Sequence, residues 1–281
     1  MRTLPEKTGD DYIIELKALK KSFEGQNVLN GVDLKIRRGE TMVIIGASGG
    51  GKSVILKHCI GLLQPDEGEV IVNGTVISSP RHIDVKTIRK NMGMLFQGAA
   101  LFDSMDVGEN IKFALREHDS SLTEEQLDEI VAEKLGVINL QPEFRFKMPS
   151  ELSGGMKKRL GLARVIALNP EIILYDEPTT GLDPITSDVI NDLIIDMQRK
   201  LNVTSIVVTH DMVSAYKIAD RIAMLFNGNI IFTGTSEQLK AAQNPYVRQF
   251  INGQRYLPTD PVLDRTREEF GRVATDALDR R

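Results

Sequence analysis

Residues 46–53 read Gly46-Ala47-Ser48-Gly49-Gly50-Gly51-Lys52-Ser53, and this stretch decides the fold. It fits G-x-x-x-x-G-K-[ST], the pattern of a phosphate-binding loop. Glycine has no Cβ, so successive backbone N–H groups can curl around an anion. In this pattern the lysine contacts the β- and γ-phosphates and the serine hydroxyl is a ligand of Mg²⁺. The stretch therefore predicts that Lys52 and Ser53 bind a nucleotide and its metal ion.

The segments around the loop predict a parallel sheet. An apolar run at 42–45 indicates a strand that enters the loop, and residues 54–60 indicate a helix that leaves it. Two further apolar runs, at 172–175 and 205–208, suit central strands of a parallel sheet that is covered on both faces. Because ligands bind at the carboxyl ends of parallel strands, we expect the polar residues after these runs to converge on one nucleotide.

Polar side chains follow both later strands. Asp176 and Glu177 come directly after the first of them, and His210 follows the second. A carboxylate at Asp176 can hold Mg²⁺ next to Ser53. Glu177 can orient, or deprotonate, an attacking water. The spacing therefore predicts a metal ligand and a catalytic base side by side.

Composition limits the function classes. The chain has 281 residues, of which 41% are hydrophobic and 26% charged, as expected of a globular protein with one large domain or a domain and a subdomain. A net charge of −4 argues against nucleic-acid binding through bulk charge.

The single cysteine, Cys59, has apolar neighbours and is expected to be buried, in a reducing compartment. The first residues are polar, without a secretion signal, and no apolar run approaches the ~20 residues of a membrane-spanning helix. Work at a membrane would therefore need a partner that spans it.

The pattern along the chain predicts an insertion. Residues 13–40 are expected to form short strands and turns, and 68–74 another strand. From about 100 to 168 the periodicity becomes helical, with a helix-start signal at 121–127. We expect an α/β domain at 13–245 that carries this helical subdomain, followed by a C-terminal extension at 246–281.

A second motif leads to a family resemblance. Leu152-Ser153-Gly154-Gly155-Met156 precedes a helix rich in leucine, alanine, lysine and arginine. Together with the phosphate-binding loop and the acidic pair, it resembles the LSGGQ signature of the ATP-binding-cassette (ABC) ATPases, and the likeness extends from 13 to about 240. It implies a P-loop NTPase fold of the α/β class, with a parallel sheet core, an N-terminal antiparallel β subdomain and a helical signature subdomain. Met156 departs from the usual glutamine and removes an amide side chain.

The resemblance implies a head-to-tail homodimer in which each ATP lies between two copies. Ser153, Gly154 and Gly155 would bind the γ-phosphate of the ATP held by the other copy. Gln97 looks like the Q-loop glutamine, which binds Mg²⁺ or the attacking water and couples to a membrane partner. His210 looks like the switch histidine that senses the γ-phosphate.

Two more positions match the family's motifs. Asp183, in Gly181-Leu182-Asp183, looks like the D-loop at the dimer interface. Phe23 lies where the family places an aromatic that stacks on adenine, with a core aromatic as the alternative. The implied nucleotide-binding residues are Phe23, Gly46, Ser48, Gly49, Gly50, Gly51, Lys52, Ser53, Val54, Ser153, Gly154, Gly155 and Asp183. The implied catalytic residues are Lys52, Gln97, Glu177 and His210, and the implied Mg²⁺ ligands are Ser53, Gln97 and Asp176.

Rival classes within the resemblance fit less well. Cassette ATPases that organise chromosomes insert long coiled coils between phosphate loop and signature, and the segment between Lys52 and Ser153 is too short for them. Translation-factor cassettes carry two copies on one chain, and this chain has one. A regulatory module would tolerate loss of Lys52 or Glu177, and both are present. We therefore expect the ATPase subunit of a transporter.

Smaller details favour one type of transporter. Val54, Phe102-Asp103, Leu115-Arg116-Glu117-His118 and Met156 together resemble the ATPase subunits of MCE (mammalian-cell-entry) phospholipid transporters. The resemblance implies an inner-membrane permease, a periplasmic MCE-domain lipid-binding protein and a small STAS-domain regulator as partners, with no nucleic acid. The subunit would lie on the cytoplasmic face of the inner membrane and power phospholipid transport between the two membranes of a Gram-negative envelope. Other ABC importers and lipoprotein-release systems are the alternatives.

Two apolar features lead to hypotheses about partners. The first is a cluster around Gln97, which is interpreted as subdomain core with a few residues lining a groove for a permease helix. Its members are Leu95, Phe96, Leu101, Phe102, Met105 and Phe113. The second is the tail, where apolar residues from Leu263 to Ala277 lie near one helical face. It is interpreted as a solvated tail, or alternatively as a helix that docks on the second copy or on a regulator.

Overall fold

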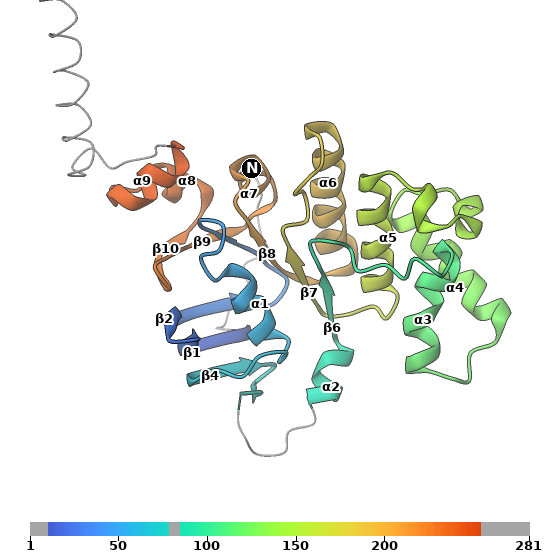
Figure 1. The fold of residues 1–281 in the computed structure, drawn as a ribbon, viewed down its shortest axis with the longest axis horizontal. Coiled ribbons are helices and arrows are strands. Elements are labelled where there is room, and N and C mark those ends of the chain that lie inside the picture. Colours follow the sequence, from blue (N-terminus) through green and yellow to red (C-terminus); the bar gives the residue numbers. More distant parts are fainter. Residues whose placement is uncertain (1–10, 79–84, 254–281) are drawn as a thin grey trace, which may run out of the picture. The chain divides into compact units, whose positions relative to one another are not determined.

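The structure is a computed structural model that describes residues 11–78 and 85–253 (Figure 1). The chain divides into two compact units, with the boundary in the sequence between Thr235 and Ser236, and each is described by itself. Within the described ranges, no helix combines the length and the apolar character that a membrane span requires.

A six-stranded sheet forms the core of the first unit. Its strands, in spatial order, are β10 (Asn229–Gly234), β9 (Arg221–Phe226), β3 (Thr41–Ile45), β8 (Thr204–Thr209), β7 (Ile172–Asp176) and β6 (Met92–Leu95). All neighbours are parallel except β10 and β9. Every residue of β3, β7 and β8 is buried, as the three unbroken apolar runs predicted.

The register of this sheet aligns the carboxyl ends of four strands. Ile45 of β3 pairs with Thr209 of β8, and Asp176 of β7 pairs with Val208. β6 pairs in parallel with β7, so it ends at the same edge. The loops that follow the four strands therefore leave the sheet side by side.

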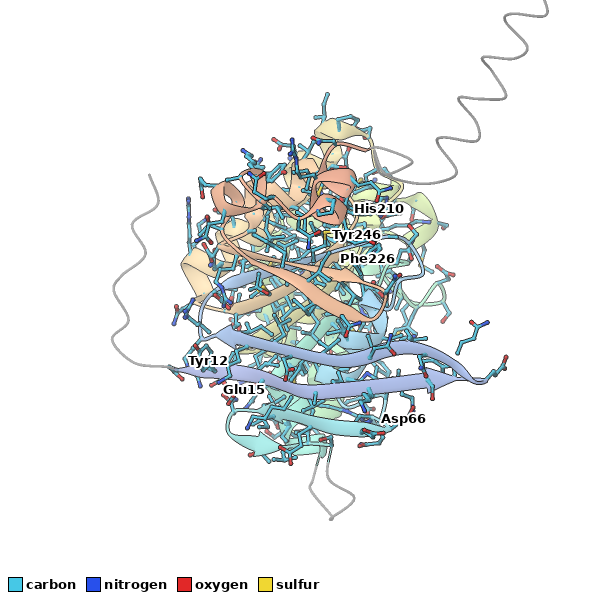
Figure 2. The ribbon with its side chains drawn as sticks, turned by 90° about the vertical axis from the view of Figure 1, so that its left-hand side faces the viewer. Tyr12, Glu15, Asp66, His210, Phe226 and Tyr246 are labelled. Carbon is cyan, nitrogen blue, oxygen red and sulfur yellow. The ribbon has the colours of Figure 1, made fainter. Side chains whose placement is uncertain are left out.

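A second, antiparallel sheet has the order β2-β1-β4-β5. Its strands are β1 (Tyr12–Phe23), β2 (Gln26–Arg37), β4 (Glu67–Val72) and β5 (Thr75–Val76). Figure 2 shows Tyr12 at one end of this sheet and Asp66 at the other. The expectation of short strands was wrong in length, since β1 and β2 have 12 residues each. Their pairing contains irregularities in register, and at one of them Ala18 has φ +45° while its N–H donates to the Asp33 carboxylate at 2.9 Å.

Helices pack around the six-stranded sheet. They are α1 (Lys52–Cys59), α2 (Val85–Lys90), α6 (Pro184–Leu201) and α7 (Met212–Ile218). α1 begins at Lys52, two residues before the predicted start, so the phosphate-binding loop passes directly into it. Cys59 is fully buried as expected, and burial raises the pKa of its thiol to about 12.

The predicted helical subdomain is confirmed between β6 and β7. It contains α3 (Val107–His118), α4 (Glu124–Val137), α5 (Gly154–Ile166) and the short 3-10 helices Pro142–Phe146 and Pro149–Glu151, and α3, α4 and α5 are grouped together in Figure 1. α4 starts where the sequence indicated, because Thr123 and Gln126 form a reciprocal capping box. α5 packs against β6, which places the signature motif at the N-terminus of a helix attached to the sheet edge.

The second unit contains α8 (Ser236–Lys240) and α9 (Pro245–Ile251) in its described part. The apolar face predicted between Leu263 and Ala277 lies outside the described residues.

The contact between β6 and α5 leads to a stability prediction. A Cβ on Gly93 would overlap Cγ1 of Val165 and come within 3.2 Å of the Val165 carbonyl oxygen. Gly93→Ala should therefore lower the free energy of unfolding by about 1–3 kcal/mol, the usual cost of overpacking. Chemical denaturation followed by circular dichroism measures it. Gly136→Ala is the matched control, because a Cβ there would meet no atom within 4 Å other than its chain neighbours and the backbone of its own helix. Equal midpoints for the two variants would contradict the prediction.

Candidate functional site

A cavity of about 360 Å³ lies at the carboxyl ends of the parallel strands. Its walls come from the phosphate-binding loop, the β1–β2 turn and the loops after β6, β7 and β8. The lining residues are Phe23, Val28, Ser48, Gly49, Gly51, Lys52, Ser53, Val54, Gln97, Glu177, Thr180 and His210. The fold thus brings together ten predicted site residues from five separate segments.

The phosphate-binding loop has the geometry its glycines allow. Gly51 caps α1 with φ +99°, a conformation that L side chains rarely adopt, and a Cβ there would lie 3.0 Å from Val28. The Nζ of Lys52 donates to the carbonyl oxygens of Gly46 at 2.9 Å and Ala47 at 3.1 Å. The ammonium is therefore held over the loop at the N-terminal end of α1, where positive charge and the helix dipole attract an anion.

A hydroxyl and a carboxylate meet beside the loop. The Oγ of Ser53 donates to Oδ1 of Asp176 at 2.7 Å. Both are oxygen ligands of the kind that Mg²⁺ prefers, and Mg²⁺ is usually held by one or two protein groups together with water and substrate phosphates. The donor set therefore fits a magnesium ion at the phosphate-binding loop.

Glu177 is held through both its backbone and its carboxylate. Its φ is +48°, outside the usual range for glutamate, and its N–H donates to the Val208 carbonyl oxygen at 3.0 Å. Its Oε2 lies 2.9 Å from Nδ1 of His210 and accepts from the Thr180 hydroxyl at 3.1 Å. Its Oε1 lies 3.5 Å from the Lys52 ammonium. The carboxylate is thus fixed between the histidine and the lysine that the sequence singled out.

Phe23 stands at the mouth of the cavity. It is 41% exposed, so the alternative of a core aromatic is wrong. The preceding residues are held by Asp66, whose carboxylate accepts from the Lys21 ammonium at 2.6 Å and the Ser22 N–H at 2.6 Å. These hydrogen bonds lower the pKa of Asp66 to about 2. The end of β1 that carries Phe23 is therefore anchored, and its ring is available to a planar ligand.

The signature and the D-loop do not line this cavity. They lie against each other at the N-termini of two helices. Ser153 caps α5, and Asp183 caps α6 by accepting from the Ile185 and Thr186 N–H groups at 3.0 Å each. A Cβ on Gly155 would overlap the Thr186 side chain. The structure thus separates the predicted nucleotide-binding residues into one set in the cavity and another at this pair of helix ends.

Sequence reasoning missed three residues that touch the site. Val28 and Thr180 line the cavity, and Lys158 of α5 reaches the backbone of Gln97 and Glu177. Thr180 lies three residues after Glu177, so a hydroxyl this close to the acidic pair in sequence could have been named as a candidate. Val28 and Lys158 carry no local signal, because only the tertiary fold brings them there.

Comparison with known proteins supports the same interpretation. The model of the ABC transporter family matches residues 29–180. The chain is 40% identical to the intermembrane phospholipid transport system ATP-binding protein MlaF of Haemophilus influenzae, over 92% of this chain and 98% of that protein. It is 42% identical to the probable ribonucleotide transport ATP-binding protein mkl of Mycobacterium tuberculosis H37Rv, over 87% of this chain and 68% of that protein.

A solved structure gives the same fold. The chain resembles the ATP-binding cassette MJ0796, seen as a dimer in a post-hydrolysis state with ADP and Pi, with a TM-score of 0.73 and 31% identity. The match covers 79% of this chain and 98% of that chain. The predicted fold class is confirmed.

The position of Phe23 leads to a binding prediction. Phe23→Ala should weaken nucleotide binding about tenfold, or ~1.4 kcal/mol, because the stacking surface is lost. The denaturation midpoint should barely change, since the ring is 41% exposed. Titration with a fluorescent ATP analogue measures the affinity. Phe146→Ala, which removes a 70% exposed aromatic outside the cavity lining, is the control. Equal affinity in both variants would refute the stacking role.

Proposed function

The chain belongs to the ABC transporter family, and from that premise we propose that it is the ATP-hydrolysing subunit of a phospholipid transporter between the inner and outer membranes of a Gram-negative envelope. It is an ABC ATPase with the P-loop fold of its structural relatives. The phospholipid cargo rests on the likeness to MlaF, which extends over nearly the whole of both chains. That end-to-end match carries the proposal.

We propose one role for each group of the cavity. The phosphate loop and Lys52 bind the triphosphate, and Phe23 stacks on the adenine. Ser53, Asp176 and Gln97 hold Mg²⁺, which when bound neutralises charge on the phosphates. Glu177 positions and deprotonates the attacking water. The 2.9 Å contact between His210 and Glu177 supports a histidine that responds to the γ-phosphate beside the base.

The site is proposed to be completed by a second copy. Ser153 and its helix N-terminus lie outside the cavity that Lys52 lines, which supports a γ-phosphate contact made across a dimer. Closing on ATP and opening after hydrolysis would then be coupled to transport. The relative MJ0796 is dimeric with ADP and Pi bound.

The proposed partners are an inner-membrane permease, a periplasmic MCE-domain lipid-binding protein and a small STAS-domain regulator, with the ATPase on the cytoplasmic face.

Aromatic residues near Gln97 support a permease groove. Phe96 and Phe113 are partly exposed, and the rings of Phe113 and Phe102 lie 4.7 Å apart. Leu95, in contrast, is core. A groove lined by these aromatic residues would suit a short amphipathic helix.

Purification of the full chain from its native membranes tests the cargo and the partners. Mass spectrometry should identify an integral-membrane permease, an MCE-domain protein and bound phospholipid, and the complex should move labelled phospholipid between vesicles only with ATP. Transport of a ribonucleotide, or of an amino acid with a periplasmic receptor, would contradict the proposal.

The proposed base leads to a kinetic prediction. Glu177→Gln should still bind ATP but turn over about 10²–10⁴-fold more slowly, because an amide cannot take the proton of the attacking water. Release of phosphate at saturating ATP measures it, and gel filtration with ATP should show the dimer trapped. Glu171→Gln is the matched control, since Glu171 is half exposed at the opposite end of β7. Turnover by Glu177→Gln at the rate of this control would exclude the role.

A further inference from the structure

Lys158 is a buried cation that joins the signature helix to two loops of the cavity. It lies in the second turn of α5 and is only 6% exposed. Its Nζ donates to the carbonyl oxygen of Gln97, and to that of Glu177 at 3.5 Å. One side chain of the helical subdomain therefore holds the backbone of the proposed Q-loop glutamine and the backbone of the proposed base.

Lys158 is a buried cation whose hydrogen bonds go to the main chain. Burial lowers the pKa of Lys158, and the charges of Asp176 and Glu177 only partly oppose this effect. Among the residues that the structure describes, its hydrogen bonds go to main-chain carbonyls and none of its contacts is an ion pair. Burial of the ammonium is therefore offset by the two carbonyl contacts that it makes, and both of these lie on loops of the cavity.

The loop that Lys158 holds has a strained backbone. Ala99 and Ala100 follow Gln97 closely and have φ +61° and +49°, the left-handed region that alanine rarely adopts. α5 contacts this segment again further along the helix. A Cβ on Gly161 would lie 3.0 Å from the Ala99 Cβ, and a guanidinium N–H of Arg164 donates to the Ala100 carbonyl oxygen. The signature helix thus contacts the loop at three points.

We propose that Lys158 is a positioning residue that sets Gln97 relative to Glu177, so that the pose of the signature helix determines the geometry around the attacking water. This inference rests on the proposed roles of Gln97 and Glu177. A movement of α5 by even one ångström would alter both carbonyl contacts, and misplacement on this scale can cost about 10²-fold in rate. ATP binding depends on the phosphate-binding loop, which Lys158 does not touch.

Lys158→Met in the full chain, purified with its co-purifying partners, tests the proposal. The substitution keeps the volume and removes the donor. The turnover number should fall about 10–100-fold while KM for ATP changes less than twofold, because only the reacting geometry is disturbed. The denaturation midpoint should fall, since the two carbonyl oxygens lose their donor. Amide hydrogen exchange of peptides over 97–102 should become faster, which reports the released loop directly. Lys158→Arg, which retains a cationic donor, should recover most of the rate.

A second buried lysine provides a control for the effect of removing a buried ammonium. Lys134 of α4 is 3% exposed, and its ammonium bonds to Asn169 Oδ1 at 2.7 Å and to Glu133 at 2.8 Å. It lies in the same subdomain and makes no contact with the cavity. Lys134→Met should lower the denaturation midpoint and leave the turnover number unchanged. Loss of turnover at Lys158 but not at Lys134, with a similar fall in both midpoints, separates positioning from folding.

The outcomes are decisive in both directions. Turnover by Lys158→Met within twofold of the unmodified chain would overturn the inference, as would failure of both Lys158→Met and Lys158→Gln to fold. Glu177→Gln is assayed in parallel. If it turns over normally, the proposed role of the base fails; if it is inactive while Lys158→Met is normal, only the role of Lys158 fails.

Discussion

The site depends on the register of four parallel strands. Because Ile45 pairs with Thr209, and Asp176 with Val208, the loops after β3, β8 and β7 begin at the same edge of the sheet, and β6 adds a fourth. Backbone hydrogen bonds, not contacts among the functional side chains, therefore bring the phosphate-binding loop, the acidic pair and the histidine together. A slip of one residue would turn each strand's side chains to the opposite face and would move the functional residue at its end out of line with the others.

This dependence explains why so much of the site could be predicted from the sequence. Each group follows directly after a continuous apolar run, so one short segment of sequence indicates both the strand and its functional residue. Ligands bind at the carboxyl ends of parallel strands, and this rule predicts that the groups lie close together. The capping box at Thr123 worked for the same reason, since its two partners are three residues apart. Local patterns were predictable wherever the physical cause of the structure was itself local.

The remaining features have causes that are distant in sequence. Lys158 stands in a run of basic residues that resembles a solvated helix face, yet it is buried because α5 packs against β6 and the loop that follows. The positive φ of Glu177 is held by a hydrogen bond to Val208 on a neighbouring strand, 31 residues further along the chain by number. The pairing of β1 is irregular around Ala18, which no period-two pattern displays. Tertiary packing decides these features, so single-sequence reasoning could not.

The two helix ends beside the signature differ in how they would meet a phosphate. Asp183 places a carboxylate at the N-terminus of α6, and hydrogen bonds from Thr186 hold its pKa below the usual range, so the carboxylate is ionised and offsets the positive end of that helix. Ser153 caps α5 with a neutral hydroxyl, 3.4 Å from the Met156 nitrogen, and leaves the dipole of α5 uncompensated in its first turn. An anion approaching this surface is therefore attracted by α5 and repelled by the Asp183 carboxylate. These charges favour Ser153 for the proposed contact with a second copy's γ-phosphate, and the role of Asp183 at the dimer interface stays a prediction.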